Sequence, residues 1–444
     1  MFYTSNFQAL YEQKRKSVED VLELIHSGDV VIVAQAGAEP RPLLEKLHTV
    51  ADRVHGVDVQ TCLPVASYEF ITNSSLKDAL FNHGWYFTKD LREAQKNGNA
   101  TFTPQHAHIA AWKKLAGIKG RRIVLFCTCS PMDRNGYLSL SISNVYEREF
   151  IDAGALVICE VNPNYPRTFG DNIVHISEVS ALVESDRPVP AVQLVPYTDV
   201  DAAIGRNISE LVEDGSTIQL GIGNIPNAVA AELRQKKHLG IHTEMFTESM
   251  VDLIECGAVD NSQKGFYTGY SVCAFAFGSR KLYNYLNDNP TVLFKSGSWV
   301  NDPFQIKNNN KFVSINATLE IDLTGQCASE AIGSHQYTGT GGQADTILGS
   351  QRSPGGKSIL AMHSTYMAQD AEGLPVEKSK IVPFLTQGSI VSLSRNDVDY
   401  VVTENGTAWL RGLSVRDRVN ALIGIAAPQF RDELHFVAKK NQIW

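Results

Sequence analysis

The sequence has 444 residues, of which 43% are hydrophobic and 20% are charged, and its formal net charge is −8 at pH 7. At roughly 100 to 200 residues per domain, this length predicts two or three domains, each with its own core. The acidic balance argues against nucleic acid as the main partner, because duplex binding depends on a basic surface. The composition is that of a globular enzyme and not of a disordered chain.

The first residues and the cysteines predict a cytoplasmic protein that does not enter a membrane. Residues 1–17 are polar and charged and lack the apolar centre of a signal peptide. The longest apolar stretches, such as Val30 to Ala38, reach about half of what a membrane span needs. Seven scattered cysteines fit reduced thiols without a disulfide framework. We interpret Cys127 and Cys129 as core residues of one strand face and predict no metal site.

Several predicted elements of the first half of the chain recur in the second half. A helix with a regular apolar face ends at a glycine and leads into a short strand, a proline-containing turn and a second helix. A later strand leads to an aspartate and a glycine three residues apart. The offset stays between 187 and 189 residues. The matched segments are 21–28 and 208–215 for the helix, Val30 to Ala34 and Thr217 to Leu220 for the strand, 36–40 and 221–226 for the turn, and 123–136 and 312–325 for the later strand and its turn.

This repeat predicts the fold class and the domains. Helices that alternate with apolar strands are typical of an α/β fold with mainly parallel sheets covered by helices on both faces. We therefore predict two related α/β lobes, residues 1–190 and 191–444. The join falls between Asp186 and Val200, where prolines punctuate a stretch without helical pattern.

The first candidate site is the turn Gly221-Ile-Gly223-Asn224-Ile-Pro226, between a predicted strand and a predicted helix. Such a turn brings backbone N–H groups and a helix N-terminus to one point, which suits a phosphate or another anion. A dinucleotide-binding fold would have GxGxxG here and an acidic residue about 20 residues further on, near Glu244. Pro226 replaces the third glycine, so the turn by itself fits a tight structural turn as well as a ligand loop.

The second candidate is Glu244, which we expect to close a strand over Leu239 to Thr243 and to precede a helix that reaches Cys256. Side chains at the carboxyl ends of parallel strands point into the crevice where ligands bind. Glu248 is the alternative carboxylate, but we expect it in the first helical turn, where it offsets the helix dipole. His242 has no HExxH-type partner nearby, so we interpret it as a hydrogen-bonded core histidine.

The third candidate is the loop Gly339-Thr-Gly341-Gly342-Gln343-Ala-Asp345. Three glycines in four positions disfavour both helix and strand, and they expose the backbone N–H groups. By itself the loop fits a flexible surface segment as well as an anion or oxyanion site.

Together these segments resemble the acetyl-CoA hydrolase/transferase family of class I CoA-transferases, in particular its 4-hydroxybutyrate and butyryl-CoA:acetate transferases. The likeness covers nearly the whole chain, and the order and spacing of its motifs are more specific than any single one. The motifs are Ser130-Pro-Met-Asp133-Arg-Asn-Gly136-Tyr, Glu160-Val-Asn162-Pro-Asn-Tyr-Pro166-Arg167-Thr168, Gln219-Leu-Gly221-Ile-Gly223-Asn-Ile-Pro226, His242-Thr-Glu244, Asn301-Asp-Pro303, Gly341-Gly342-Gln343-Ala-Asp345, Val401-Val-Thr403-Glu404-Asn405-Gly406 and Leu413 to Arg418.

The resemblance implies a NagB/RpiA/CoA-transferase-like fold, an active site mostly on the second domain, and a homodimer or higher homo-oligomer. It implies that Glu244 is the nucleophile, and that the Asn301 amide and the Gly342 backbone N–H contact the oxyanion. Coenzyme A enters as substrate and covalent intermediate, and no permanently bound cofactor or metal is implied. Asn405 stands where relatives often carry tyrosine or another bulky residue, so acyl specificity stays open. The residues implied to bind substrate or CoA are Gln219, Gly221, Gly223, Asn224, Pro226, Gly341, Gln343 and Asp345.

The implied reaction is CoA transfer between short carboxylic acids, with butyryl-CoA or 4-hydroxybutyryl-CoA as donor and acetate as acceptor. A carboxylate with a pKa near 4.3 is ionised at pH 7, so Glu244 would attack a thioester without a general base. Three alternatives stay open. An acyl-CoA hydrolase would use the same glutamate, an NAD-dependent oxidoreductase would use the glycine turn, and a catalytically silent CoA-binding subunit would use neither for chemistry.

Overall fold

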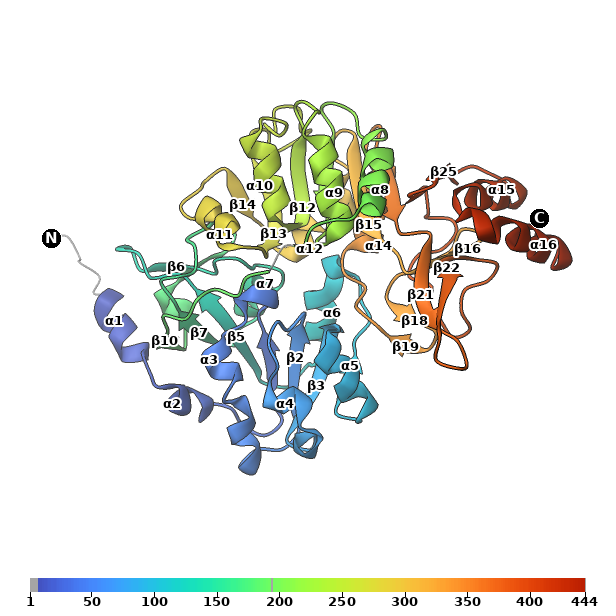
Figure 1. The fold of residues 1–444 in the computed structure, drawn as a ribbon. Helices are drawn as coiled ribbons and strands as arrows, with labels where there is room; N and C mark the ends of the chain where they lie inside the picture. Colours follow the sequence, from blue (N-terminus) through green and yellow to red (C-terminus); the bar gives the residue numbers. More distant parts are fainter. Residues whose placement is uncertain (1–6, 193–194, 444) are drawn as a thin grey trace. The chain divides into compact units, whose positions relative to one another are not determined.

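The computed structural model describes residues 7–192 and 195–443 (Figure 1). The chain divides into two compact units. The first, here the first lobe, comprises Met1–Gln193 and Val272–Val300, and the second lobe comprises Leu194–Ser271 and Asn301–Trp444. The second lobe is thus interrupted in sequence by a segment of the first. Residues 1–6, at the start of the polar N-terminal segment, and residues 193–194, within the predicted join, lie outside the described residues.

The first lobe is built on a seven-stranded sheet in the order β10-β7-β5-β1-β2-β3-β4, with every pair parallel. β1 is a continuous run of buried valine and isoleucine, as expected of a strand covered on both faces. The strands of this sheet are β1 Val30–Val33, β2 Val57–Cys62, β3 Leu80–Tyr86, β4 Ala100–Phe102, β5 Ile123–Cys129, β7 Leu156–Val161 and β10 Ala181–Glu184.

Short helices and a few further strands complete this lobe (Figure 1). Side chains from α2, α3, β1, β2 and β5 meet in one apolar core. The helices are α1 Phe7–Lys14, α2 Val18–Leu22, α3 Arg41–Leu44, α4 Glu69–Thr72, α5 Lys89–Lys96, α6 Ala110–Gly117, α7 Glu147–Asp152, α11 Arg280–Leu286 and α12 Gly297–Val300. The further strands are β6 Tyr137–Ser139, β8 Phe169–Gly170, β9 Ile173–His175, β13 Ser271–Ala276 and β14 Val292–Phe294.

The second lobe has six strands in the order β25-β24-β20-β15-β11-β12, parallel except for the β24–β25 hairpin at the edge. These strands are β11 Thr217–Leu220, β12 Gly240–Phe246, β15 Phe312–Ala317, β20 Lys357–Ala361, β24 Tyr400–Thr403 and β25 Gly406–Trp409. Small sheets add β16 Glu320–Asp322, β17 Cys327–Ala328, β18 Ala331–Ile332, β19 His335–Gln336, β21 Thr365–Gln369, β22 Pro375–Ser379 and β23 Ile381–Val382.

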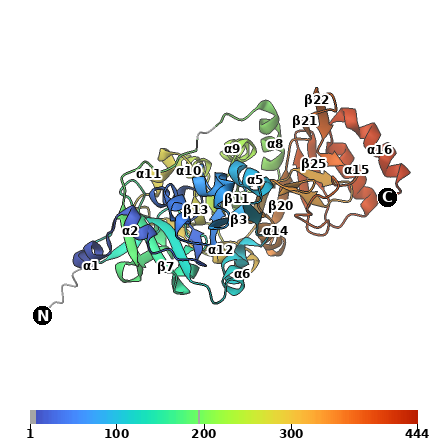
Figure 2. The ribbon, with the colours of Figure 1, turned by 90° about the horizontal axis from the view of Figure 1, so that it is seen from below.

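Helices of the second lobe follow its strands in the α/β manner. α15 and α16 lie beside β25 at the C-terminal end of the chain in both ribbon views (Figures 1 and 2). They share an apolar core with β20, β24 and α14. The helices are α8 Asp199–Ser209, α9 Asn224–Leu233, α10 Glu248–Glu255, α13 Pro303–Ile306, α14 Gln343–Arg352, α15 Val415–Ile425 and α16 Arg431–Lys440. The predicted α/β class with mainly parallel sheets is confirmed.

The strand registers confirm the internal repeat. In the first lobe, Val31 on β1 pairs with Val124 on β5 and with Val59 on β2. In the second, Ile218 on β11 pairs with Val313 on β15 and with Ile241 on β12. The central strand of each lobe therefore has equivalent neighbours in the same register, with Val31 equivalent to Ile218.

The turns predicted to match have the same hydrogen bonds. The Asp133 carboxylate accepts the Asn135 N–H at 2.8 Å, and Asp322 accepts the Thr324 N–H at 2.9 Å. Each turn ends at a glycine with a positive φ, 84° at Gly136 and 99° at Gly325. A residue with a Cβ is strained at such φ values, which accounts for glycine at both positions.

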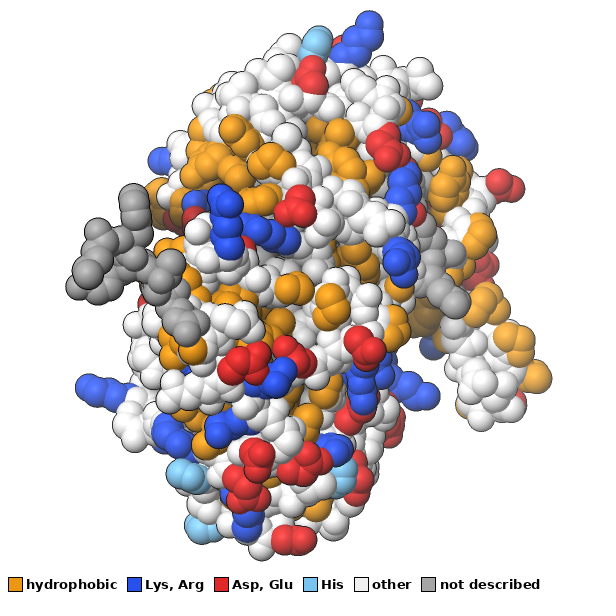
Figure 3. Space-filling model, turned by 90° about the vertical axis from the view of Figure 1, so that its left-hand side faces the viewer, with side chains coloured by type: hydrophobic (Ala, Val, Ile, Leu, Met, Phe, Trp, Pro, Cys, Tyr) orange, Lys and Arg blue, Asp and Glu red, His pale blue; other side chains and the backbone are white. Residues whose placement is uncertain are grey.

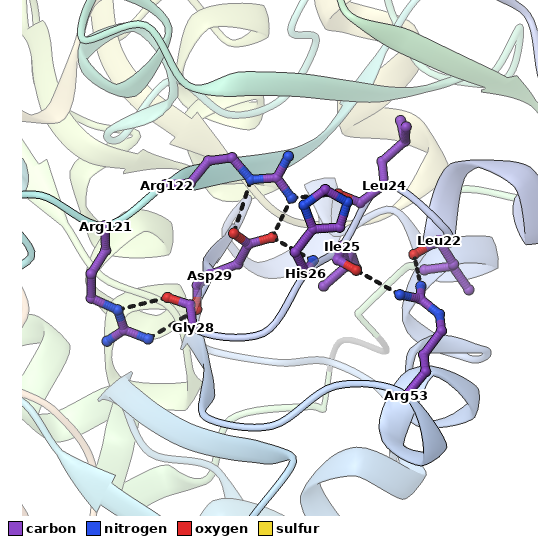
Figure 4. Close-up of polar contacts among 9 residues, drawn as sticks. All are labelled: Leu22, Leu24, Ile25, His26, Gly28, Asp29, Arg53, Arg121 and Arg122. Atoms are coloured by element: carbon purple, nitrogen blue, oxygen red, sulfur yellow. Dashed lines mark hydrogen bonds and ion pairs between the residues drawn. The ribbon is translucent and has the colours of Figure 1, made fainter.

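The chain before each central strand is also held in the same way. The Asp29 carboxylate accepts the His26 N–H at 2.7 Å, and Arg122 pairs with this carboxylate and donates to the Leu24 carbonyl (Figure 4). At the equivalent place, the Ser216 hydroxyl accepts the Glu213 N–H at 3.2 Å. These contacts pair backbone groups in the short segment that joins the helix to the strand.

Two predicted boundaries are wrong. The second helix of the first lobe is split into α3 and a 3₁₀ turn over Leu47–Asp52. The strand predicted to stop at Thr243 continues to Phe246, so Glu244 lies inside β12. A charged residue is expected to end a buried strand, but here the extended backbone continues through Glu244 to the buried Phe246.

The distribution of charge on the surface and the character of the helices bear on binding to nucleic acid and to membranes. On the face drawn in Figure 3, basic and acidic side chains are interspersed among hydrophobic ones, and neither sign forms a continuous field among the described residues. None of the helices in the described part of the chain is long and apolar enough to cross a bilayer.

Candidate active site

Glu244 lies on β12 in the part of the strand that extends beyond the residues paired with β11. Thr217 on β11 pairs with Gly240 on β12, and Ile218 pairs with Ile241. Glu244 therefore stands near the carboxyl edge of the parallel sheet of the second lobe, where ligands bind in open α/β sheets.

Two hydrogen-bond donors hold the Glu244 carboxylate. Asn301 Nδ2 donates to Glu244 Oε2 at 2.7 Å, and the backbone N–H of Gly342 donates to the same carboxylate. Asn301 is 1% exposed, so its amide is fixed within the protein. A carboxylate accepts hydrogen bonds only, which requires the amide to present its nitrogen. The structure thus brings together the three residues that the sequence predicted to be catalytic.

Position 342 has no room for a side chain. A Cβ there would lie 2.0 Å from Glu244 Oε2 and 2.7 Å from Asn301 Nδ2. The φ of Gly342 is −92°, which any residue adopts, so close approach and not backbone conformation requires glycine. The glycine lets the main chain come within hydrogen-bonding distance of the half-buried Glu244 carboxylate.

The environment changes the acidity of Glu244. Burial raises its pKa to about 7; the Asp345 carboxylate adds to the rise, whereas the hydrogen bonds from Asn301 and Gly342 oppose it. The expectation of full ionisation at pH 7 rested on the ordinary pKa near 4.3 and is wrong for this environment. Near neutral pH the carboxyl exists in both protonation states.

The glycine loop leads into the N-terminus of α14, as its composition predicted for a non-regular segment. Gly341 has a φ of 53°, and Gly342 caps the helix. Asp345 is fully buried in the first turn of α14 and acts electrostatically on Glu244. Gln343 Nε2 donates to the Ala317 carbonyl at 2.8 Å, which ties the loop to the end of β15.

The glycine turn after β11 has the predicted strand-to-helix form. β11 ends at Leu220, and α9 begins at Asn224, with Gly223 as its N-cap at a φ of 123° that excludes other residues. Pro226 stands in the first turn of α9, where a proline costs no hydrogen bond. Gly221, Gly223 and Asn224 are at least partly exposed at the same sheet edge as Glu244.

Gln219 belongs to a buried polar row that the sequence reasoning only partly found. Its side chain accepts from the Ser314 hydroxyl at 3.4 Å, and Ser314 donates to Thr346 on α14 at 2.8 Å. Asn316 Nδ2 donates to Ser314 at 2.8 Å. The internal repeat could have indicated this row. Ser314 on β15 is equivalent to Leu125 on β5, so a polar side chain replaces an apolar one at this position. The row fixes α14, and therefore Gly342, against β15.

Other residues considered from the sequence have different surroundings. His242 is 1% exposed and packs against the rings of Phe266 and Phe312, as a core histidine does. Glu248 begins α10, as predicted. Asn405 lies in the exposed β24–β25 turn and donates to Ser364.

Lys264 was not among the residues predicted from the sequence. It is buried and donates to the Ile241 carbonyl at 2.9 Å, which supports β12.

Two family models match the chain. Residues 3–193 match the acetyl-CoA hydrolase/transferase N-terminal domain, and residues 278–438 match the C-terminal domain of the same family. Together they cover most of both halves of the sequence.

Two transferases and one solved structure match nearly the full length of the chain. A succinyl-CoA:cyclohexane-1-carboxylate CoA transferase of Geobacter metallireducens is 41% identical, covering 98% of this chain and 97% of that protein. A 4-hydroxybutyrate coenzyme A transferase of Clostridium kluyveri is 37% identical, covering 98% and 99%. The crystal structure of RipA from Yersinia pestis, at 34% identity, superposes with a TM-score of 0.89 over 99% and 100%. Acetyl-CoA hydrolase of Yarrowia lipolytica, 30% identical, matches 58% of this chain and 49% of its own length.

Proposed function

Because the chain belongs to the acetyl-CoA hydrolase/transferase family and is an enzyme of the CoA-transferase class, we propose that it moves coenzyme A between short carboxylic acids through a glutamyl-CoA thioester on Glu244. One observation carries the proposal: a half-buried carboxylate at a sheet edge accepts hydrogen bonds from a side-chain amide and from a backbone N–H. A purely structural carboxylate does not require a glycine packed against its oxygen.

The reaction proceeds by four carbonyl attacks. Ionised Glu244 attacks the thioester carbonyl of an acyl-CoA, which forms a mixed anhydride and releases CoA thiolate. The thiolate attacks the glutamyl carbonyl, forms the glutamyl-CoA thioester and displaces the first acid as its carboxylate. A second carboxylate then attacks this thioester, and the released CoA thiolate attacks the new acyl carbonyl. Glu244 is regenerated ionised, and no net proton is consumed.

Asn301 and Gly342 serve the steps at the carboxyl carbon of Glu244. When a nucleophile adds to that carbon, the negative charge develops on the carboxyl oxygens of Glu244, which the two donors already contact. Donors fixed before the reaction need no reorganisation as the charge forms. Each such donor typically contributes about 3 to 4 kcal/mol of transition-state stabilisation.

The raised pKa of Glu244 has two consequences for transfer. The carboxylate is more basic than an exposed one and hence a stronger nucleophile once ionised. Its ionised fraction falls below pH 7, because burial raises the pKa to about 7. Transfer therefore increases as pH rises through about 7 and levels off above it.

The test is to trap the covalent intermediate. Incubation with an acyl-CoA followed by borohydride would reduce a glutamyl-CoA thioester to a primary alcohol, to be located by mass spectrometry. We expect the modification on Glu244 alone. Reduction at Glu248, or an unmodified chain that still transfers CoA, would overturn the mechanism.

Hydrolysis of acyl-CoA by the same glutamate is the second candidate. It differs only in that water, instead of a carboxylate, attacks the glutamyl thioester. The full-length coverage of the transferase relatives, against about half for the hydrolase, favours transfer. Consumption of the donor acyl-CoA should therefore depend on added acetate and yield acetyl-CoA, whereas consumption at the same rate without any acceptor, with release of free CoA, would favour the hydrolase.

The acyl groups belong to the proposal as well. We propose butyryl-CoA or 4-hydroxybutyryl-CoA as donor and acetate as acceptor, which the names of two relatives support. The name of the relative at 41% identity adds succinyl-CoA and cyclohexane-1-carboxylate to the pairs that a substrate panel must include. The pair with the highest kcat/KM identifies the substrates.

The proposal extends to a homodimer or higher homo-oligomer in the cytoplasm. The compartment is supported by seven cysteines that form no disulfide within the described residues. The oligomer rests on the family resemblance and is tested by light scattering of the purified protein. A monomer at working concentration would contradict it.

A further inference from the structure

Three cysteines of the first lobe lie together in its core. Cys127 and Cys129 are two residues apart on β5 and so share one face of the strand. Cys159 on β7 pairs in register with Cys127, and their sulfur atoms are 3.5 Å apart. All three are 0% exposed, and their sulfurs lie within 4.8 Å of one another. The sequence prediction lacked the third thiol, because Cys159 comes from another strand.

The spacing of the sulfurs matches a metal site. Zinc binds cysteine sulfur at about 2.3 Å, so three sulfurs around one ion would be about 4 Å apart. The separations of the three sulfurs are near this value. Small rotations of the side chains would direct all three at one point between β5 and β7.

A half-buried cation, the Lys14 ammonium, interacts with the thiols. Lys14 on α1 donates to the Ile176 carbonyl at 2.8 Å and to the Val179 carbonyl, and its ammonium interacts electrostatically with Cys159. Buried charges are stable only when compensated. Three thiolates, one divalent ion and the Lys14 ammonium sum to zero charge, whereas a monovalent ion would leave one negative charge uncompensated.

The repeat argues that the fold does not require these cysteines. From the strand registers, the equivalents of Cys127, Cys129 and Cys159 in the second lobe are Asn316, Thr318 and Leu360. The same strand frame is therefore built there without a thiol. Three cysteines convergent from two strands are a feature of the first lobe alone.

We propose that Cys127, Cys129 and Cys159 form a three-thiolate site for a divalent thiophilic cation of the zinc type. On binding, each thiol releases its proton to water and forms one sulfur–metal bond. Because the site is enclosed, the ion enters while the lobe folds. It joins β5 to β7 and has no part in the carboxylate chemistry of Glu244.

The first experiment measures metal content. The full chain is expressed with added Zn²⁺, passed over a gel-filtration column with EDTA, and analysed by inductively coupled plasma mass spectrometry. We expect one Zn²⁺ per chain, lost in Cys159→Ser and retained in Cys273→Ser, a matched substitution of a buried cysteine of the same lobe outside the cluster. A wild-type chain with no more zinc than Cys159→Ser would overturn the proposal.

A second measurement applies even if a cysteine variant fails to fold. Wild-type protein expressed with Cd²⁺ should show the ultraviolet charge-transfer band of a cadmium–thiolate site, and its absence would overturn the proposal. Lys14→Gln, which removes the compensating charge, should weaken retention against a competing chelator about 10- to 100-fold. Unchanged retention would contradict the assignment of a divalent ion balanced by Lys14.

Discussion

The two lobes share one strand frame but carry different side chains at equivalent places. From the registers of β1 with β2 and of β11 with β12, Cys62 in the first lobe is equivalent to Glu244 in the second. Ala36 and Gly223, also equivalent, both have positive φ values, of 52° and 123°. The frame is thus retained in detail, while the candidate nucleophile exists in only one copy.

The sheet face beneath α14 shows the same contrast. In the second lobe, Gln219 pairs with Ser314 and Ser314 with Ser358, which gives a polar row across three strands. At the equivalent positions of the first lobe, the row is Ile32, Leu125 and Val157. A polar row holds α14 and Gly342 in register, whereas an apolar row serves only the core. The fold is one component and the site another, added to one lobe.

The strongest test of this contrast is to change the two equivalent residues in parallel. Glu244→Gln removes the carboxylate that we propose to form the covalent thioester, so we expect kcat to fall by about four orders of magnitude or more. Cys62→Ser should leave kcat unchanged, because the first lobe lacks the Asn301–Gly342 pair. The measurement is CoA transfer to acetate with each purified variant. Comparable losses in both would mean that the first lobe contributes a reacting group.

Gly342→Ala should have the next largest effect. The new Cβ would lie 2.0 Å from Glu244 Oε2, so the loop or the carboxylate must move by more than an ångström. A displacement of this size costs on the order of 100-fold in rate, and loss of the backbone donor adds to it. Steady-state kinetics measure the loss. Gly424→Ala, on a helix with open space around it, is the matched control and should retain full activity. An active Gly342→Ala enzyme would exclude the backbone donor from the mechanism.

Asn301→Ala tests the side-chain donor by itself. Removal of one oxyanion donor should lower kcat about 100- to 1,000-fold, equivalent to about 3 to 4 kcal/mol. KM should change little, because in the proposed mechanism the donor acts on the glutamyl carbon and not on the bound acyl group. Steady-state kinetics of Asn301→Ala, with kcat and KM determined separately, measure the effect. A rise in KM with constant kcat would instead place Asn301 in substrate binding.

Sequence reasoning reached the frame because helix ends, strands and Asp–Gly turns recur at a constant offset, and local patterns determine such elements. It reached Glu244, Asn301 and Gly342 only through family resemblance, since the three come from separate segments that folding brings together. The raised pKa of Glu244 could not be predicted, because it depends on burial and on Asp345 in three dimensions. Cys159 was missed for the same reason: its partners lie on another strand.

The stability of the protein should depend on Glu244 and on pH. Burial raises the pKa of Glu244 to about 7 in the folded state, against 4.5 in its unperturbed state. The folded state therefore binds the proton more tightly, and ionisation destabilises the fold increasingly from about pH 4.5 to pH 7 and constantly above. Glu244→Gln should raise the free energy of unfolding by about 2 to 3 kcal/mol at pH 8 and by little at pH 4.5. Urea titrations at both pH values measure it, and an equal effect at both would contradict a buried charge.

The smallest effect concerns the apolar row of the first lobe. Ile32→Gln introduces the side chain that its equivalent, Gln219, carries in the second lobe. Here its register partners are Leu125 on β5 and Gln60 on β2, and the side-chain oxygen of Gln60 already accepts from Trp85 Nε1 at 3.2 Å. Ile32 is fully buried, and Leu125, unlike Ser314, offers no hydroxyl to the amide. An unsatisfied buried amide costs about 1 to 3 kcal/mol, so Ile32→Gln should lose that much more stability than Ile32→Val. Chemical denaturation of both variants gives the difference. If Ile32→Gln were no less stable than Ile32→Val, the first lobe could accept a polar row as readily as the second lobe does. The lack of an equivalent site in the first lobe would then depend only on Cys62 and on the missing glycine loop.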